Sequence, residues 1–213
     1  MPKIEPFEQF AKEYDVWFDD NPKVYEAEIK TIQKLLLPFE KGIEIGIGSG
    51  KFALPLNIKT GVEPSKNMAK IAESKGIKVI EGIAEKLPLE SETYDCVLMV
   101  TTICFVDDPM QSLKEIYRIL APGGFFIIGF IERNSTIGKL YEKNHRKSRF
   151  YKEATFFTAK EVTELLEKSG FVDIQSYQTL LGNTLEDAQT TVKEGSNEGA
   201  FIAIRAIKNK IRI

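Results

Sequence analysis

A glycine-rich loop directly after an apolar segment is the part of this sequence best suited to hold a ligand. Residues 42–50 place one acid, Glu44, two residues before the first of three alternate glycines, which are Gly46, Gly48 and Gly50. Glycine has no Cβ and adopts positive φ, so the backbone at such positions can come close to a ligand. A carboxylate inside an apolar segment needs a polar partner. The pattern therefore predicts a polar ligand at the C-terminal end of a buried strand.

A second acid, Glu63, lies 19 residues after Glu44, at the end of the next predicted strand. The two oxygens of a carboxylate in this place accept hydrogen bonds from the vicinal hydroxyls of a ribose. Residues 48–53 also fit the dinucleotide pattern G-x-G-x-x-A. Taken alone, these residues leave two options open: a dinucleotide, or another cofactor that contains a ribose.

Alternating strand and helix patterns position these residues. The apolar segments predict five strands, at residues 42–47, 59–62, 78–81, 95–100 and 125–130, with helices between them. Such alternation is typical of a parallel sheet with right-handed crossovers. Two later strands, at 171–177 and 200–207, have no convincing helix between them. We therefore expect them to pair antiparallel at one edge of the sheet.

Helix signals surround this sheet. Ser65 is a suitable N-cap for a helix that stops at Gly76, and residues 158–161 form a capping box for a helix that Gly170 closes. At the N-terminus, aromatic residues recur at helical spacing and predict one amphipathic helix over 5–20. They are Phe7, Phe10, Tyr14 and Trp17. A second helix is predicted over 23–37.

The composition suits one globular domain, with 213 residues, 43% of them hydrophobic, and a formal net charge of −2. Without a basic excess, binding to nucleic acid is not expected. No apolar run is long enough to span a bilayer, and residues 1–20 lack the apolar region of a signal peptide. Cys96 and Cys104 are expected to be reduced thiols, so we expect a cytoplasmic protein; no metal site is predicted.

Several motifs follow one another in a specific order. They are residues 44–50 (EIGIGSG), 61–65 (GVEPS), 81–88 (EGIAEKLP), 94–98 (YDCVL) and 113–124 (LKEIYRILAPGG). Each motif is moderately specific, whereas the ordered set at these spacings is very specific. On these motifs the chain, from about Phe7 to its C-terminus, resembles the class I S-adenosylmethionine (SAM)-dependent methyltransferases of the small-molecule group.

The resemblance implies a three-layer, Rossmann-like α/β fold. Its seven-stranded sheet has the order 3-2-1-4-5-7-6, with strand 7 antiparallel, which agrees with the edge pair predicted above. The resemblance also implies a single methyltransferase domain over residues 1–213. An N-terminal helical lid is expected at about 1–40 and a cap insertion at about 131–157.

SAM is the cofactor that the resemblance implies, and family roles transfer to matching positions. These cofactor-binding positions are Tyr14, Tyr25, Glu44, Gly46, Gly48, Gly50, Glu63, Pro64, Ser65, Met68, Ile83, Ala84, Glu85 and Thr101. Glu44 is expected to receive the cofactor's ammonium, Glu63 to hold the ribose, and Tyr14 to close the pocket. Ile83 is a departure, because many relatives have an aspartate there that accepts a hydrogen bond from the adenine amino group. An isoleucine only packs against the ring.

The expected acceptor is a small organic molecule, and cation–π contact with the lid aromatics allows a small amine. The residues expected to face the acceptor are Trp17, Thr102, Arg146 and Arg149. The single histidine, His145, is a candidate base, with a surface histidine among lysines as the alternative. An NAD(P)-dependent oxidoreductase and a non-catalytic SAM-binding module remain alternative functions. The sequence gives no indication of oligomeric state.

Overall fold

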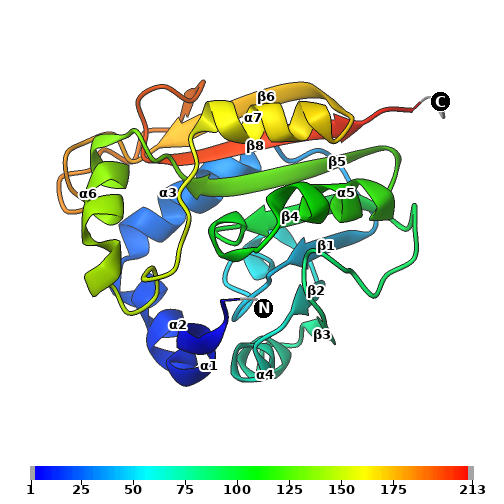
Figure 1. The fold of residues 1–213 in the computed structure, drawn as a ribbon, viewed down its shortest axis with the longest axis horizontal. Helices are drawn as coiled ribbons and strands as arrows, with labels where there is room; N and C mark the ends of the chain where they lie inside the picture. The colour runs from blue at the N-terminus through cyan, green and yellow to red at the C-terminus, as the bar shows by residue number, and fades with distance from the viewer. Residues whose placement is uncertain (1–2, 211–213) are drawn as a thin grey trace.

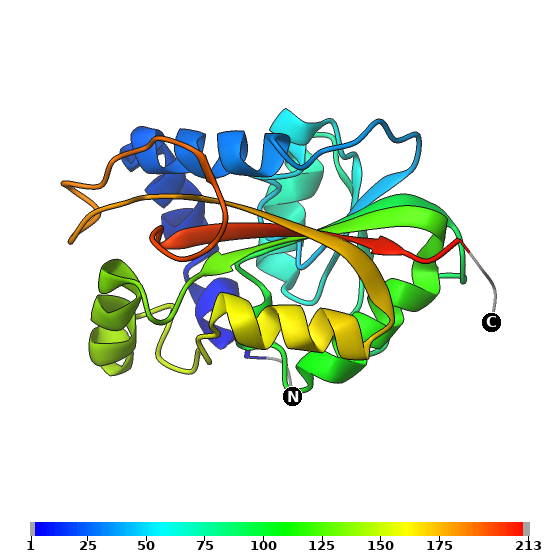
Figure 2. The same cartoon turned by 90° about the horizontal axis from the view of Figure 1, so that it is seen from above.

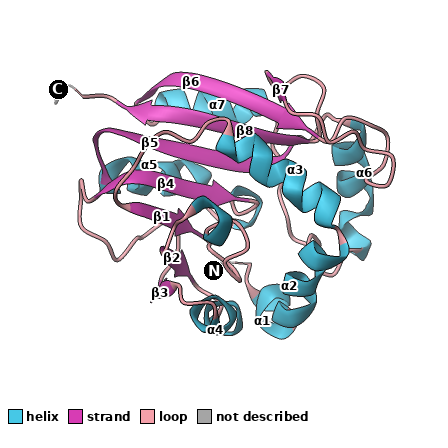
Figure 3. Cartoon of the chain, turned by 180° about the vertical axis from the view of Figure 1, so that it is seen from behind, coloured by secondary structure: helices cyan, strands magenta, loops and turns pink. Residues whose placement is uncertain are grey.

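The structure is a computed structural model that describes residues 3–210. Within that range the centre is an eight-stranded sheet with the order β3-β2-β1-β4-β5-β8-β6-β7 (Figures 1 and 3). Strands β1 to β5 pair in parallel, and β8 is antiparallel to both β5 and β6. The strands are β1 (Gly42–Ile45), β2 (Thr60–Glu63), β3 (Lys78–Glu81), β4 (Tyr94–Val100), β5 (Leu120–Ile131), β6 (Phe171–Thr179), β7 (Lys193–Glu194) and β8 (Phe201–Lys208).

The predicted strand order is confirmed, because β8 takes the place of the antiparallel seventh strand between β5 and β6. The edge strand β7 was not predicted. It consists of two exposed residues that pair with Tyr177 and Gln178 of β6. Two polar residues contain no alternation of apolar and polar side chains, so the sequence held no signal for this strand.

Helices cover both faces of the sheet. Figure 2 shows α3 on one side, and α5 and α7 on the other, which confirms the three-layer arrangement. The helices are α1 (Glu5–Gln9), α2 (Ala11–Asp20), α3 (Pro22–Gln33), α4 (Lys66–Ser74), α5 (Pro109–Ile119), α6 (Thr136–Asn144) and α7 (Ala159–Lys168), with short 3₁₀ turns η1 (Leu54–Leu56), η2 (Ile103–Phe105) and η3 (His145–Lys147). None of the helices in residues 3–210 has the length and apolar character of a membrane span.

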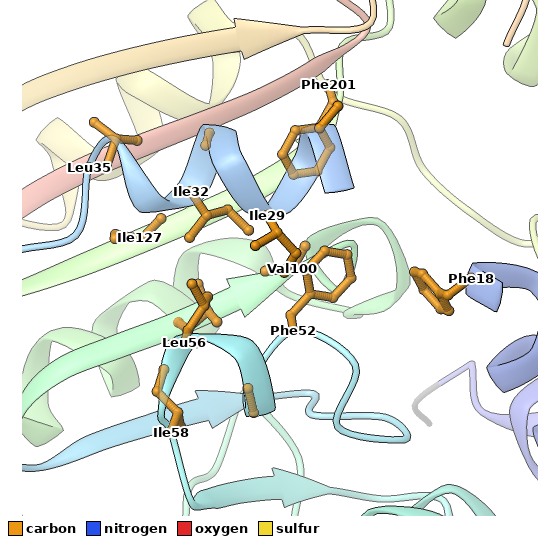
Figure 4. Packing of buried hydrophobic residues seen from close by; sticks show 14 of the residues in the cluster. Phe18, Ile29, Ile32, Leu35, Phe52, Leu56, Ile58, Val100, Ile127 and Phe201 are labelled. Carbon is orange, nitrogen blue, oxygen red and sulfur yellow. The ribbon is translucent and has the colours of Figure 1, made fainter. Parts of the chain in front are cut away.

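Strand β4 lies at the centre of the core and is buried on both faces. Successive side chains of a strand point to opposite faces. Leu98 and Val100 accordingly join the cluster under α3, which Figure 4 shows with Ile29, Ile32 and Phe52, and Met99 joins the cluster under α5 and α7. A strand buried in this way needs a nearly continuous apolar sequence, as residues 95–100 have.

The N-terminal helix predicted over 5–20 is two helices. Phe10, with φ −121° and ψ 30°, is not helical and separates α1 from α2. The change of direction lets both helices pack against α4. The period of the aromatic residues continues through Phe10, so the sequence pattern did not reveal the break. The following helix, α3, ends at Gln33, earlier than the predicted residue 37.

Strand β5 begins earlier in the chain than predicted, whereas two helix caps lie at the predicted residues. Strand β5 begins at Leu120, ahead of the Pro-Gly-Gly segment that was predicted to precede it, because Leu120 pairs with Tyr94 before the register shifts. The predicted caps are confirmed. Ser65 accepts a hydrogen bond from the Met68 backbone, and the capping box that opens α7 is complete.

We expect Thr158→Ala to lower the free energy of unfolding by about 1 kcal/mol, because the Thr158 hydroxyl caps the start of α7. Urea unfolding followed by circular dichroism measures the change. Thr163→Ala, the same substitution inside the same helix, is the matched control and is expected to leave stability unchanged or raise it. Equal losses in both variants would contradict the assigned role of the cap.

Candidate functional site

A pocket opens at the C-terminal ends of β1, β2 and β4, next to α1 and α2. Residues from α1, α2, the glycine loop and the segments after β2, β3 and β4 line it, and part of it is open to solvent. Many residues predicted from the sequence line it, namely Tyr14, Glu44, Gly46, Gly48, Glu63, Pro64, Met68, Ile83, Ala84, Glu85, Thr101 and Thr102. The structure therefore brings these residues together in one place, where parallel sheets bind their ligands.

The three alternate glycines all have positive φ, at 70° for Gly46, 55° for Gly48 and 81° for Gly50. Their surroundings differ. A Cβ on Gly50 would lie 2.3 Å from Ile77 Cδ1, in the core, and Gly50 does not line the pocket. A Cβ on Gly48 would meet only the end of Met68, at 3.3 Å. Gly48 is thus the glycine that leaves room for a ligand, while Gly50 serves packing rather than the predicted cofactor contact.

Glu44, on β1, is almost completely buried and incompletely paired. It is 1% exposed, and its Oε2 has no hydrogen-bond partner. Burial raises the pKa of this carboxyl group well above 4.5, although a hydrogen bond from the Ala53 backbone opposes the shift. A buried oxygen without a partner is costly. The pocket-lining position of Glu44 therefore suits a cationic or hydrogen-donating ligand group.

Glu63, at the end of β2, is held in a fixed orientation by the backbone. Its Oε2 accepts from Gly48 N at 2.8 Å, and its Oε1 accepts from Ser65 N at 2.9 Å. Burial raises the pKa of this carboxyl group to about 7, against the lowering effect of those two hydrogen bonds. Each carboxylate oxygen has a further lone pair. The carboxylate can thus accept from two neighbouring hydroxyl groups while its orientation is maintained.

The wall formed by residues 82–85 is mainly apolar. Ile83 and Ala84 line the pocket with Met68 and Val106, and they provide flat surfaces for a planar ring. Glu85 also lines it, but its Oε1 already accepts from the backbone nitrogens of the loop before α5, at 2.7 and 3.3 Å. The Glu85 carboxylate is thus part of the wall's own structure.

Thr101, just after β4, has a φ of 49°, which is unusual for a β-branched residue. Its N–H donates to Gly129 O at 2.8 Å, and its carbonyl oxygen accepts from Cys104 Sγ at 3.3 Å. Its hydroxyl oxygen lies 3.5 Å from the Tyr14 hydroxyl. Strained residues of this kind cluster at functional sites. The conformation places the Thr101 side chain beside Tyr14, which also lines the pocket.

Helices α1 and α2 are fastened over the pocket by polar contacts. Glu8 Oε2 accepts from Ser65 Oγ at 2.6 Å and from Asn67 N at 3.1 Å, so α1 holds the start of α4. The hydrogen bond from Ser65 lowers the pKa of Glu8. Two ion pairs continue this attachment along α2: Asp15 with Lys75 at 2.6 Å, and Asp19 with Lys51 at 2.6 Å.

Three predicted ligand-facing residues have structural positions outside the pocket lining. The Tyr25 hydroxyl donates to the Lys51 carbonyl oxygen. Ser65 caps α4 and donates to Glu8. Trp17 packs edge-on against Phe18, with ring centroids 5.2 Å apart. These three side chains thus stabilise the glycine-rich loop, the start of α4 and the lid helices and do not line the pocket.

The predicted base and the predicted basic substrate residues also lie away from the pocket. His145 is in η3, and its Nδ1 contacts the carbonyl oxygen of Glu142, one turn earlier. Arg146 is exposed, and Arg149 pairs with Glu13 and lies over the Phe10 ring at 4.3 Å. The geometry gives no support to His145 as a base in this pocket, and it assigns Arg149 to the lid surface.

The sequence reasoning missed several pocket residues, mostly apolar ones. They include Phe7, Phe18, Phe52, Phe105 and Val106. Phe7 had been assigned to the lid helix without a ligand contact. Phe18, on α2, had not been assigned a ligand contact either. Phe52, Phe105 and Val106 come from loops and turns in which no period is long enough to show which side chains face inward. Only the packing of distant segments brings them to one place.

Comparisons with known proteins agree with this geometry. Residues 43–128 match the methyltransferase domain family. A crystal structure of a SAM-dependent methyltransferase from Thermotoga maritima has a TM-score of 0.93 and 48% identity, covering 97% of this chain and 100% of that one. The chain belongs to the SAM-dependent methyltransferases. An uncharacterized protein of Methanocaldococcus jannaschii is 46% identical over 95% of this chain and 98% of its own. A Staphylococcus aureus demethylmenaquinone methyltransferase is 25% identical over 63% of this chain and 69% of the enzyme.

SAM is the cofactor of this methyltransferase, and the residues present fit it. The unpaired Glu44 Oε2 would receive its ammonium group, Glu63 its ribose hydroxyls, and the Ile83–Ala84 wall its adenine. At Gly48 the backbone would allow the close approach that its methionine part requires. The kinship favours this methyl donor over the nicotinamide cofactor that the glycine loop alone also allowed.

The buried Glu44 should make the ligand-free protein less stable as pH rises. A pKa raised by folding means that the unfolded chain ionises first, so the stability falls between about pH 4.5 and the folded pKa. Relative to Glu44→Gln, the wild-type free energy of unfolding should decrease by up to about 1.4 kcal/mol per pH unit over that interval. Urea unfolding at several pH values measures this difference. A constant difference would contradict the raised pKa.

Glu63→Ala should weaken SAM binding by roughly 1–3 kcal/mol, because the ribose hydroxyls lose their acceptor. Isothermal titration with SAM measures the change. Glu81→Ala is the matched control, because Glu81 is an exposed acid that pairs with Glu63 in the register of β2 and β3. An unchanged dissociation constant in Glu63→Ala would exclude the ribose role.

Proposed function

We propose that this methyltransferase transfers the methyl group of SAM to a small organic acceptor, and that the acceptor is an amine. The observation that supports this is a set of aromatic side chains around the inner end of the cofactor pocket. Phe7, Tyr14 and Phe105 line the pocket next to Thr101 and Thr102. This is the end at which the family places the reactive methyl group.

The aromatic side chains form a continuous wall. Phe7 is 4.8 Å from Phe105 and 5.3 Å from Tyr14, measured between ring centroids. Behind them, Phe150 is 5.3 Å from Tyr14, and Tyr151 stacks on Phe105 at 5.8 Å. Such a wall excludes water from the reacting groups. A pocket bordered by helices and rings favours a small acceptor over a polymer, which needs a long open groove.

The chain's own task in this reaction is to align the reactants and to exclude water. SAM supplies a methyl group that is already activated by its sulfonium. The acceptor's lone pair forms the new bond to the methyl carbon while the carbon–sulfur bond breaks and its electron pair stays on sulfur, which leaves S-adenosylhomocysteine. A nitrogen that still bears a proton after attack keeps it as an ammonium and releases it to solvent after the product has left the pocket. Glu44, Glu63 and the glycine loop hold the donor, and the aromatic wall orients the acceptor.

Two facts support an amine in particular. Aromatic ring faces attract cations, and the wall offers several of them. The Thermotoga maritima protein, whose structure covers nearly all of this chain, is described as a possible histamine N-methyltransferase. Histamine is a small amine and belongs to the proposed acceptor class.

The direct test is turnover with methyl-labelled SAM. We expect S-adenosylhomocysteine to form in the presence of histamine or another small amine, and not with transfer RNA or an unfolded protein as acceptor. Titrations with SAM and with NAD run in parallel, and only SAM is expected to bind. Methylation of a macromolecule alone would contradict the proposed acceptor class, and binding of NAD without SAM would contradict the proposed chemistry.

A further inference from the structure

Glu63, the acceptor for the ribose hydroxyls, is held by two backbone donors that come from different segments. Gly48 N, in the glycine loop after β1, donates to Glu63 Oε2 at 2.8 Å, and Ser65 N donates to Glu63 Oε1 at 2.9 Å. A carboxylate that is held at both oxygens keeps its orientation while both donors stay in place. The ribose site therefore depends on the contacts that fix the segments around Gly48 and Ser65.

The lid helix α1 holds the segment around Ser65. The Ser65 hydroxyl donates to Glu8 Oε2 at 2.6 Å, and the same oxygen accepts from Asn67 N at 3.1 Å. Asn67 Nδ2 donates in return to the Glu8 carbonyl oxygen at 2.9 Å. Ser65 is fully buried, and Pro64, whose ring fixes φ, leaves little freedom between Ser65 and Glu63. A shift of α1 would thus displace Ser65 and, with it, one donor of Glu63.

The lid helix α2 holds the segment around Gly48. Lys75, just after α4, donates through Nζ to Asp15 Oδ1 at 2.6 Å and to the Ser49 carbonyl oxygen at 3.0 Å. Ser49 directly follows Gly48 and is 2% exposed. Lys75 and Asp15 are each less than a third exposed, so solvent ions screen this pair less than a surface pair. The ammonium thus connects α2 to the part of the loop that donates to Glu63.

Other acids of the lid make no such connection. Glu5, on α1, accepts from Gln9 of the same helix at 3.2 Å. Glu13, on α2, pairs with Arg149 in the segment after η3. In the hydrogen bonds and ion pairs within residues 3–210, neither acid contacts the segments that hold the two backbone donors. The contacts of Glu8 and Asp15 therefore differ in place from the rest of the lid's polar attachments.

The orientation of the Glu63 carboxylate decides how well it binds two neighbouring hydroxyl groups. Hydrogen bonds weaken steeply when the donor and the acceptor are misaligned. Two vicinal hydroxyls have a fixed spacing, so they bind well only to a carboxylate that is already in the matching orientation. A lid that holds both backbone donors therefore contributes to ribose binding without touching the ribose.

We propose that two lid acids, Glu8 and Asp15, are positioning residues for ribose recognition. They fix the two backbone donors of Glu63, and thereby the orientation in which its carboxylate accepts from the ribose hydroxyls of SAM. The lid is then part of the donor site and not only its cover. Because coupling between two sites is reciprocal, a bound ribose also holds the lid in place. This role concerns the methyl donor alone and does not depend on the acceptor.

Binding of ribose analogues to the full chain tests the proposal. The probes are S-adenosylhomocysteine and its 2′-deoxy and 3′-deoxy analogues, measured by isothermal titration. We expect the wild type to bind each deoxy analogue about tenfold more weakly, because Glu63 loses one hydroxyl partner. Glu8→Ala and Asp15→Ala should each reduce this preference to about threefold or less, and Glu63→Ala should abolish it. A lid that serves only as an attachment would weaken all three ligands equally and leave the preference unchanged.

A conservative variant and two matched controls separate positioning from attachment. Glu8→Gln keeps an oxygen that accepts from Ser65, so it should restore the ribose preference to within about twofold of the wild type. Glu5→Ala and Glu13→Ala remove an acid from the same two helices and should leave the preference unchanged. A preference that is unchanged in both Glu8→Ala and Asp15→Ala would overturn the proposal.

Hydrogen exchange of α1 measures the reciprocal effect in the wild type. At saturating concentrations, S-adenosylhomocysteine should slow amide exchange in α1 more than its deoxy analogues do. Equal protection by all three ligands would overturn the proposal even if the alanine variants do not fold. If S-adenosylhomocysteine does not bind, the ribose site and this role are both overturned. Absence of turnover with small amines, in contrast, would contradict the proposed acceptor and leave this role intact.

Discussion

The loss of water around buried carboxyl groups is the constraint that organises this protein. Glu28, Glu44 and Glu63 are each less than a tenth exposed, and burial raises the pKa of all three. Only Glu63 is fixed by two backbone N–H groups. Glu44 lines the pocket with one oxygen that has no hydrogen-bond partner, and a donating ligand group would complete it. The pocket of this methyltransferase therefore contains one carboxyl group that the backbone holds and one that still has an oxygen without a partner.

The lid is part of that arrangement, because Phe7 of α1 and Tyr14 and Phe18 of α2 line the pocket together with Glu44 and Glu63. The lid helices make different contacts at the rim of the pocket and inside it. The outer ones are polar, such as Glu8 with Ser65 and Asp15 with Lys75. The inner ones are aromatic, such as Phe7 with Phe105. Polar contacts at the rim keep the lid in register, and the rings beneath them exclude water from the reacting atoms.

Features that depend on local backbone structure could be predicted from the sequence. The burial of individual side chains depends on long-range packing and could not. The glycine loop and the cap at Ser65 depend on their own backbone, so their residue types were sufficient. Glu26 and Glu28 show the limit. They are the same residue type, two positions apart on α3, yet one is exposed and the other buried. Which acid faces inward depends on how α3 packs against the body and the lid, and no single-sequence pattern distinguished them.

The backbone at Thr101 has a consequence for how this enzyme balances robustness against chemistry. A threonine with φ of 49° sits in a conformation that glycine adopts freely, and such strain costs of order 1–3 kcal/mol. The least strained version of this backbone would have a glycine there, and it would lack a hydroxyl beside Tyr14. The threonine thus lowers stability and keeps a polar group next to Tyr14. Replacing it by glycine to raise the thermal stability would remove that hydroxyl group from the pocket.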